Sequence, residues 1–500
     1  MDSEKKVSAN RNIAITILAF FVLLSCWSFG SSIGSGGDID AHISSIWCAW
    51  GEKPGMCEDD TGSIATVPYM FQMCDGRPID SFPGCDVVKS SAEMQELRIM
   101  GPSHRSVYYK FMRLFASTDP NQSILIMRMM NSFIASLLLF GLLKFTAGRT
   151  RIASVSALTF TLIPVAIVRI PSINPHSWAT LGVMTSWAFL HGFLVTPKTD
   201  ARKKFLLGFF LFAILLPTTT RVDATTYVIF TSAVVMLHHF WKGRRIARNE
   251  IFGAGGFAIA GIASFFISAN IRSYISLQAP TGYAFGQYLL FQIVHIPESL
   301  VEVFGYSIGQ QGSGPGIVGI IGLSLFVIGL SHAMQNSNKQ QLVIVLIILS
   351  FLNVVMFKGS VIVGSLVPLP GTYVLGLITF LLGMSIITSQ SDLQFLSSRG
   401  NRRTTISLLS ITHALFFFTW MESYTKGSQI PGFFSRQTLG TFYKLSLGGG
   451  WWWNSWIGAN FVYLLGVCCL PIFFVFAWRV VDSDFDISNS ETKSPSISTS

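Results

Sequence analysis

The residues best suited to chemistry follow the first long apolar run. Two carboxylates and an imidazole, Asp38, Asp40 and His42, stand within five residues of one another. If a helix begins near Asp38, then Asp38 and His42 lie one turn apart on one face, while Asp40 points elsewhere. Such a pair can act as a general base with its orienting partner, or as two ligands for a divalent metal ion. The structural alternative makes Asp38 a helix N-cap and Asp40 a first-turn acid, which leaves His42 unexplained.

A second set of candidates is cationic and lies within or beside apolar runs. Arg128 falls inside one run, Arg169 ends another, and Arg221 with Asp223 precedes a third. An arginine inside a membrane-spanning segment is energetically costly and usually faces a partner or a water-filled cavity. These residues are therefore candidates for binding an anionic group of a substrate. The alternatives are an internal ion pair between Arg221 and Asp223, and an Arg169 side chain that reaches the lipid headgroups.

Polar and aromatic residues also precede two other apolar runs. Asn174, Pro175 and His176 form a turn, and Pro175 suits an early helical position. The turn could bind a polar substrate, although Asn-Pro is also an ordinary turn signal. The tryptophans of 451–456 could stack on sugar rings, but aromatic residues at a helix mouth mostly form the interfacial belt.

The composition places these candidates in a membrane protein. Of 500 residues, 50% are hydrophobic and only 12% are charged, which does not suit a soluble globular protein. About twelve apolar runs approach the roughly 20 residues that a spanning helix needs. The sequence therefore predicts an all-α polytopic membrane domain over residues 1–481. The expected spans are 13–31, 124–143, 152–170, 178–195, 205–216, 227–241, 251–269, 317–330, 341–356, 372–387, 406–420 and 456–478.

The basic residues indicate an orientation. The net charge is +10, and many of the cations lie in the short loops 144–151, 198–204, 242–248 and 399–403, each after an even-numbered expected helix. The positive-inside rule places such loops in the cytoplasm. We expect a multi-pass protein of the plasma (inner) membrane with both termini cytoplasmic. The positive charge is then explained by the membrane topology, and nucleic acid is not expected as a partner.

This topology leaves a large loop, residues 32–122, on the outer face. Cys48, Cys57, Cys74 and Cys85 all fall in it, and cysteines in an oxidising space favour disulfides. Pairing by proximity joins Cys48 to Cys57 and Cys74 to Cys85, although four cysteines allow three connectivities. Metal binding is the rival interpretation, but the spacings do not resemble a zinc site.

Two further segments complete the expected organisation. Residues 106–115 mix aromatic side chains with Lys110 and Arg113, which suits an amphipathic helix in the membrane interface. Residues 482–500 are rich in Ser and Thr and predict a disordered cytoplasmic tail. The sequence contains no P-loop, no convincing dinucleotide fingerprint and no clear internal repeat.

Four short motifs occur in order along the chain: Asp38, Ala41 and His42; Asn174 and Pro175; Arg221, Asp223 and Ala224; and Pro368, Pro370, Gly371 and Tyr373. Their order resembles a family of uncharacterised bacterial membrane proteins that is typical of actinobacteria. That family is similar in layout to the GT-C glycosyltransferases, and the resemblance covers most of the membrane domain. The sequence departs from the family pattern where Ile39 and Asp40 replace a Glu and a Pro, and where Thr372 replaces a common Arg. Asp40 could substitute for the missing acid, whereas the second change takes away a cation that could bind phosphate.

The resemblance implies a transferase that moves a sugar from a polyprenyl-phosphate donor to a glycan or lipid acceptor of the cell envelope, at the outer face. Asp38 would be the base, and His42 would orient it or help to bind a metal ion. No organic cofactor is implied, and a divalent metal ion at Asp38 and His42 is left open. Arginines would hold the phosphate on which negative charge builds. The expected substrate-binding residues are Arg128, Arg169, Asn174, His176, Arg221, Asp223 and Tyr373.

Two other functions fit the same features. A lipid or polysaccharide transporter or flippase would also show about twelve spans and intramembrane arginine. A non-catalytic scaffold for envelope assembly would use the outer loop as a docking surface. An enzyme should lose activity when Asp38 alone is changed, whereas a docking surface should tolerate that change.

Overall fold

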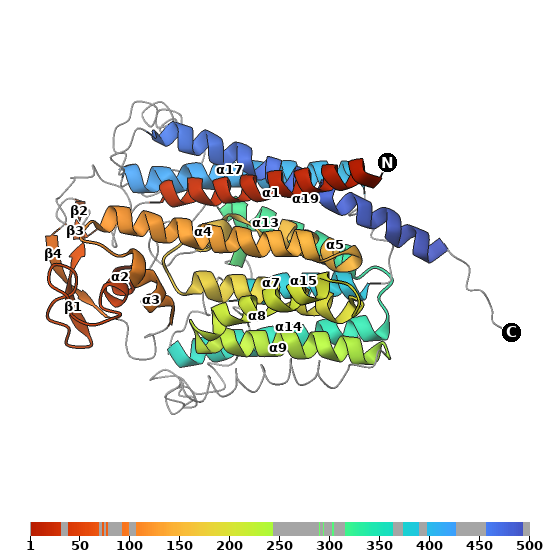
Figure 1. Cartoon of the computed structure of the whole chain (residues 1–500), viewed down its shortest axis with the longest axis horizontal. Helices are drawn as coiled ribbons and strands as arrows, with labels where there is room; N and C mark the ends of the chain where they lie inside the picture. The colour runs from red at the N-terminus through yellow and green to blue at the C-terminus, as the bar shows by residue number, and fades with distance from the viewer. Residues whose placement is uncertain are drawn as a thin grey trace.

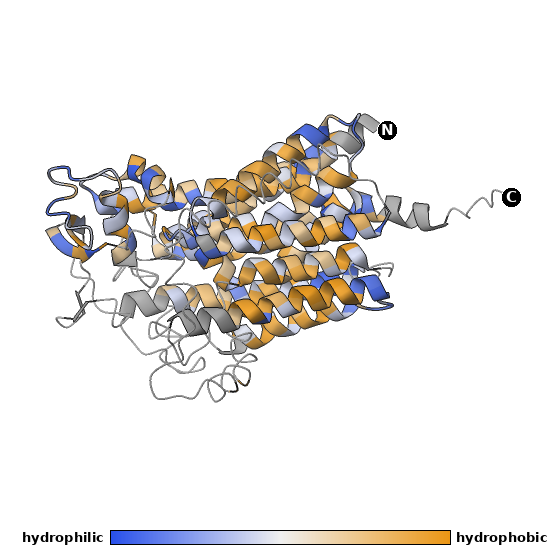
Figure 2. Cartoon of the chain, turned by 90° about the horizontal axis from the view of Figure 1, so that it is seen from below, coloured by the Kyte–Doolittle hydropathy of each residue, from blue (hydrophilic) through white to orange (hydrophobic). Residues whose placement is uncertain are grey.

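The chain folds into a bundle of helices with a small mixed domain at one end (Figure 1). The middles of the helices are mainly hydrophobic, and hydrophilic residues gather toward the two ends (Figure 2). The computed structural model describes residues 2–31, 39–69, 73–74, 77–78, 93–99, 107–243, 290, 294, 303–304, 316–363, 374–389, 398–426 and 457–493.

The bundle helices approach one another closely where glycine faces a neighbour. A Cβ at Gly182 would collide with Pro217 and with the carbonyl of Ala213, and one at Gly383 would collide with the ring of Trp187. Small residues allow such approach in helices whose faces are otherwise apolar. The bundle helices are α1 (Asp2–Phe29), α4 (Pro120–Phe145), α5 (Gly148–Thr161), α6 (Pro164–Arg169), α7 (His176–Val195), α8 (Arg202–Thr218), α9 (Val222–Trp241), α13 (Gly316–Ala333), α14 (Lys339–Val363), α15 (Leu375–Thr388), α17 (Arg399–Lys426) and α19 (Ala459–Lys493).

The helices confirm an α-helical membrane fold. Every expected span overlaps a described helix, except 251–269, which lies outside the described residues. The number of about twelve spans remains a prediction, because several described helices are short, among them Val318–Ala333 and Leu375–Thr388. Six described helices are long and apolar enough to cross a membrane: Val7–Phe29, Pro120–Phe145, His176–Val195, Lys339–Met356, Arg399–Met421 and Ala459–Asp482.

The expected third span is not one continuous helix. It divides into α5 and α6, and Pro164 begins the second of them. Proline lacks the N–H that would continue the hydrogen-bond ladder, and its ring is accommodated at the first helical position. The preceding helix α4 begins in a regular way, because Asp119 accepts the N–H groups of Asn121 and Gln122 and Pro120 occupies the first turn.

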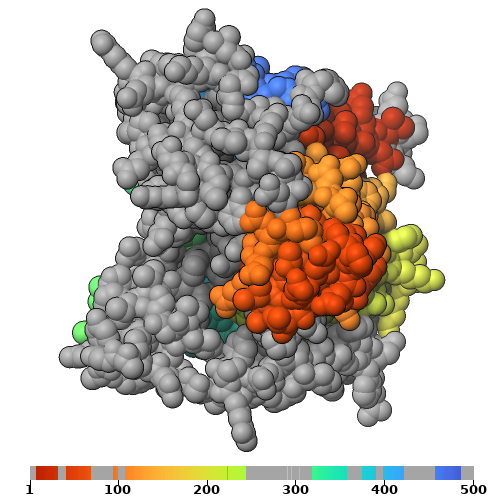
Figure 3. Space-filling model, turned by 90° about the vertical axis from the view of Figure 1, so that its left-hand side faces the viewer, coloured from red at the N-terminus to blue at the C-terminus, as the bar shows by residue number. Residues whose placement is uncertain are grey.

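The loop after α1 forms a small domain with both helix and strand. Its strands β1 (Ile64–Tyr69) and β4 (Glu93–Arg98) pair antiparallel, as do the short strands β2 (Met73–Cys74) and β3 (Arg77–Pro78). Figure 3 looks onto this end of the molecule, where the domain stands out as an orange and red mound. We call residues 39–69, 73–74, 77–78, 93–99 and 107–115 the outer domain, after the face on which the basic loops predict it. Its helices are α2 (Ile39–Trp47), α3 (Val107–Met112) and the 3-10 turn Arg113–Phe115.

A disulfide joins Cys48 and Cys57 in the outer domain. This confirms the pairing expected from proximity for these two residues. The turn that the disulfide closes also contains backbone hydrogen bonds between Lys53 and Cys57 in both directions. Only the backbone of Cys74 is described and Cys85 lies outside the described residues, so their pairing stays a prediction.

The opposite end of the bundle carries the basic loops and both described termini (Figure 1). Lys144 Nζ donates to Asn10 Oδ1 at 2.7 Å, and Arg402 Nη1 donates to Asp482 at 2.5 Å. Helix α19 continues through Lys493, and residues 494–500 of the expected tail lie outside the described residues, so the tail over 482–500 stays a prediction. The extension is held in place because Asp484, only 5% exposed, forms an ion pair of 3.2 Å with Arg151.

Replacing Cys48 and Cys57 together by serine should destabilise the outer domain. A cross-link over this short loop restricts the unfolded chain and contributes about 3 kcal/mol in the chain-entropy treatment. The expected result is faster proteolysis within residues 48–57 in the purified protein, measured against Cys468→Ser, which changes an exposed free cysteine. Equal protease resistance in the two variants would show that the cross-link contributes nothing to the domain.

Candidate active site

His42 lies in α2, where the outer domain meets the bundle. Its side chain is buried, and Nδ1 shares a hydrogen bond of 2.7 Å with the hydroxyl of Tyr109 in α3. Helix α2 is anchored beside it, because Trp47 Nε1 donates to the carbonyl of Ser117 at 3.0 Å. The bond to Tyr109 fixes the orientation of the imidazole, as a histidine that positions or moves a proton requires.

The adjacent Tyr108 points into the bundle. Successive residues of a helix project about 100° apart, so Tyr109 can contact α2 while Tyr108 contacts α4 and α7. The ring of Tyr108 lies edge-on to Trp178 with 5.0 Å between centroids, and its hydroxyl lies 3.5 Å from Nδ2 of Asn131. Burial raises the pKa of Tyr108, so its hydroxyl stays protonated. The contact between domain and bundle is therefore polar and uncharged at this point.

Asn131 of α4 holds the turn that leads into α7. Its Nδ2 donates to the carbonyl of Ser172 at 2.6 Å, and its Oδ1 accepts from Trp178 Nε1 at 2.9 Å. Within the turn, Asn174 Oδ1 accepts the backbone N–H of His176 at 2.9 Å. Asn174 thus acts as a turn-forming residue, which agrees with the structural alternative for the Asn-Pro sequence.

Asn174, His176, Arg221 and Asp223 form a connected group at the starts of α7 and α9, which we call the His176 cluster. Arg221 donates from Nε to Asp223 Oδ1 at 2.8 Å and from Nη2 to Oδ2 at 3.0 Å. This is the bidentate geometry of a strong guanidinium–carboxylate pair. Arg221 and Asp223 thus pair with each other, as one of the two interpretations expected.

The third contact of Arg221 sets the protonation of His176. Nη1 of Arg221 lies 2.6 Å from Nε2 of His176. A guanidinium has only donors and stays protonated, so Nε2 must accept, and the imidazole is then neutral with its proton on Nδ1.

Arg128 has a different environment. It is 2% exposed, and its Nη1 donates to the carbonyls of Ser28 and Ser31 at 3.1 and 2.7 Å. These carbonyls belong to the last turn of α1 and the residues just beyond it, which have no intrahelical donor. Arg128 therefore caps the C-terminus of α1, a favourable position for a cation. Its expected role in phosphate binding remains a prediction.

The other expected residues divide between described and undescribed parts of the chain. Arg169 ends α6, and its carbonyl accepts from Ser172 Oγ at 2.7 Å. Helix α2 begins at Ile39, directly after Asp38, but only the backbone of Asp40 is described. Asp38 and Tyr373 lie outside the described residues, so the predicted pair of Asp38 with His42 stays a prediction.

The sequence that forms this end of the bundle matches a known protein family. Residues 20–312 match the family described as "Predicted membrane protein (DUF2142)". The chain belongs to this family. The match covers His42, Arg128 and the His176 cluster, whereas Tyr373 lies beyond it. The family is one of membrane proteins of unknown function, which confirms the resemblance to an uncharacterised membrane family. No curated protein matches the chain.

Several residues of this DUF2142 chain that position the site were not among the expected ones. Tyr108, Tyr109, Asn131 and Trp178 link the outer domain, α4 and the turn before α7. An asparagine inside an apolar run was a usable signal, because an amide in a membrane segment needs a partner. Within the expected segment 106–115, residues Val107–Met112 do form a short helix, but Tyr108 and Tyr109 are buried against protein rather than only facing lipid.

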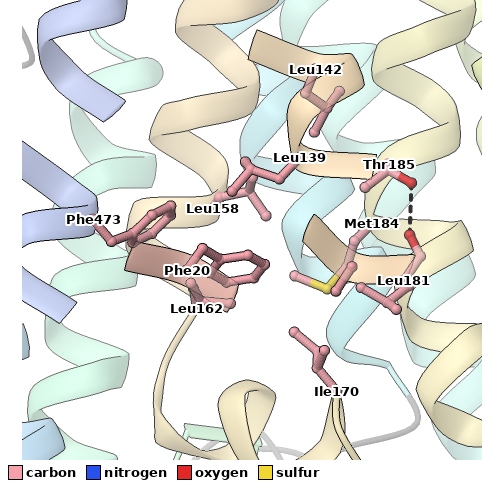
Figure 4. A pocket seen from close by; sticks show the side chains of 11 residues that line it. Phe20, Leu139, Leu142, Leu158, Leu162, Ile170, Leu181, Met184, Thr185 and Phe473 are labelled. Atoms are coloured by element: carbon pink, nitrogen blue, oxygen red, sulfur yellow. Dashed lines mark hydrogen bonds between the residues drawn. The ribbon is translucent and has the colours of Figure 1, made fainter. Parts of the chain in front are cut away.

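A small cavity lies deeper in the bundle of this DUF2142 protein (Figure 4). Its volume is about 20 Å³, and Phe20, Leu139 and Met184 are among its lining residues. Thr185, which also lines the cavity, already donates to the carbonyl of Leu181 at 2.8 Å. Cavities that are apolar and hold at most one water remain dry. This cavity is therefore a packing defect and too small for a substrate.

The described residues contain one group with metal-ligand atoms close together, made of Cys48, Cys57 and Asp60. The two sulfur atoms are already joined in a disulfide. Metal ions bind the thiolate form of cysteine, so this group does not suit a metal ion.

Replacing Arg128 by methionine should lower the stability of the whole bundle. The change leaves the carbonyls of Ser28 and Ser31 without their donor in an apolar interior, at a cost of about 2–4 kcal/mol. The thermal midpoint of the detergent-solubilised protein should fall, and Arg128→Lys should restore part of it. Lys198→Met serves as a control, because it removes an exposed cation at the other end. A purely ligand-binding Arg128 would instead leave the midpoint unchanged in Arg128→Met.

Proposed function

We propose that this DUF2142 protein is a membrane glycosyltransferase of the GT-C type, which moves a sugar from a polyprenyl-phosphate donor to a glycan or lipid acceptor of the cell envelope. The observation that carries the proposal is the His176 cluster, in which a cation, a carboxylate and a neutral imidazole adjoin at one end of a membrane bundle. A folded, disulfide-containing domain at the same end supports it.

The chemistry of transfer needs a cation for the leaving phosphate. Negative charge builds on that phosphate in the transition state, and donors aimed at it lower the barrier. Arg221 is 20% exposed and Asp223 is 27% exposed, so the pair is reachable by a ligand. An incoming phosphate competes with the Asp223 carboxylate for the same two guanidinium donors, since both acceptors suit bidentate binding. The cluster is thus stable without substrate, and Arg221 can exchange its bonds to Asp223 for bonds to a phosphate.

The acceptor hydroxyl needs a base. Asp38 is our candidate, because it directly precedes α2, and His42 is held by Tyr109 one helical turn later. A carboxylate supported by an oriented imidazole can remove the proton as the sugar bond forms. Should a divalent metal ion take part, Asp38 and His42 would be its ligands, and the ion would polarise the donor phosphate.

The orientation that we propose follows from charge. The basic loops lie at the end of the bundle opposite the outer domain, as Figure 1 shows for both termini. The positive-inside rule then puts the termini in the cytoplasm and the His176 cluster at the outer face of the inner membrane. Lipid-linked donors and envelope acceptors are available at that face.

The decisive assay measures sugar transfer from a panel of radiolabelled polyprenyl-phosphate sugars to a cell-envelope extract. Asp38→Asn should abolish transfer, and a charge-balanced double variant, Arg221→Gln with Asp223→Asn, should lower it by about 100-fold or more, because a donor to the developing charge is lost. Lys198→Gln is the matched control, since it removes a cation at the opposite end.

Folding is monitored in each variant by its thermal midpoint and its elution from a sizing column. Transfer that persists in a folded Asp38→Asn variant would exclude Asp38 as the base. A folded wild-type protein that transfers no sugar from any donor would overturn the proposal and favour a transporter or a scaffold.

A further inference from the structure

A long groove lies on the surface between α1 and α4, far from the His176 cluster. Its volume is about 590 Å³, within the range of ligand-binding pockets. Ile13 and Ser136 are buried at its floor, whereas Leu18 and Phe133 are largely exposed along its sides. The groove exists because small side chains face it: Ser136 folds back onto the carbonyl of Ser132 at 2.8 Å.

The groove has a polar end and an apolar end. At the basic end of the bundle it finishes at Lys144 and Asn10, which are joined by a hydrogen bond of 2.7 Å. From there the lining is apolar as far as Phe21 and Phe133. The ammonium of Lys144 has three protons, and the amide of Asn10 offers two more donors. Arg11 adds an exposed cation next to Asn10.

The length of the groove matches one leaflet of a membrane. Residues 10–21 of α1 span about 16 Å at 1.5 Å per residue, roughly half of a hydrocarbon core of about 30 Å. The cationic end falls where headgroups lie, and the apolar end falls near the bilayer midplane. An ordinary lipid-facing helix surface lacks this concavity.

We propose that the groove binds an anionic phospholipid of the leaflet at the basic end. One acyl chain lies along the floor between α1 and α4, and the phosphate accepts hydrogen bonds from Lys144 and Asn10. Basic pockets between membrane helices recognise anionic headgroups by this combination of charge and hydrogen bonding. The site is separate from the proposed transferase centre and does not depend on that function.

The bound lipid has a structural consequence for the bundle. Lys144 lies in the last turn of α4, where a cation already interacts favourably with the helix C-terminus. A phosphate held by Lys144 and Asn10 would bridge the start of α1 and the end of α4. The same two helices are joined at their other ends by Arg128, so the lipid would complete their attachment.

The test is native mass spectrometry of the full-length protein with phosphatidylglycerol and phosphatidylcholine of identical chains. The wild-type protein should retain one phosphatidylglycerol with a Kd about fivefold lower than that for phosphatidylcholine, the contribution of one basic residue near a charged headgroup. Lys144→Met should remove this preference. Ala14→Phe, at an exposed position inside the groove, should weaken retention of both lipids, and Lys198→Met should match the wild-type protein.

Three results would overturn the proposal. Equal retention of the two lipids by the wild-type protein would show that charge plays no part. Unchanged preference in Lys144→Met, with unchanged retention in Ala14→Phe, would place the lipid elsewhere. Displacement of phosphatidylglycerol by an equimolar isoprenoid phosphate would assign the groove to a different lipid. Because Ala14→Phe fills an exposed groove and leaves the core intact, loss of folding does not complicate its interpretation.

Discussion

Buried helix ends need hydrogen-bond donors for their last carbonyl groups, and this constraint recurs at several helix ends of the bundle. These carbonyls have no donor within their own helix, so those that are shielded from water need a protein partner. Arg128 supplies it for the end of α1, and Arg149 Nε supplies it for the last turn of α15 by donating to Ile386 at 3.0 Å. Arg151 does the same at the end of α4, where Nε donates to Thr146 at 2.9 Å. Each of these arginines joins two helices as it caps one.

The cap on α1 also positions the candidate active site. Arg128 and Asn131 are three residues apart on α4, so they project from neighbouring parts of one face. The first holds the end of α1, from which the outer domain departs, and the second holds the turn before α7. Through Trp178 and Tyr108 the same asparagine reaches the outer domain. One face of α4 therefore holds both the end of α1, which leads to His42, and the turn before α7, which leads to His176.

The sequence was sufficient for properties that depend on local or compositional signals. The apolar runs predicted the helices, the short spacing of Cys48 and Cys57 predicted their disulfide, and Arg221 with Asp223 two residues later predicted an ion pair. Contacts between distant segments were not predictable in this way. His176 meets Arg221 from 45 residues away, and His42 meets Tyr109 from 67 residues away. Such pairs depend on how helices pack, which periodicity does not determine.

Buried arginines in a membrane protein are often interpreted as ligand-binding groups, and the two best-defined cases here show why their contacts must be considered first. Arg128 is 2% exposed and donates to main-chain carbonyls, which cannot leave without unfolding the end of α1. Arg221 donates to the partly exposed carboxylate of Asp223 and to the buried imidazole of His176, which are both side-chain acceptors. A phosphate could replace the second set of acceptors at the loss of one ion pair, but could replace the first only at the loss of a helix end. Under the proposed function, Arg221 could therefore exchange its acceptors for a phosphate more readily than Arg128, whose bonds also hold a helix end.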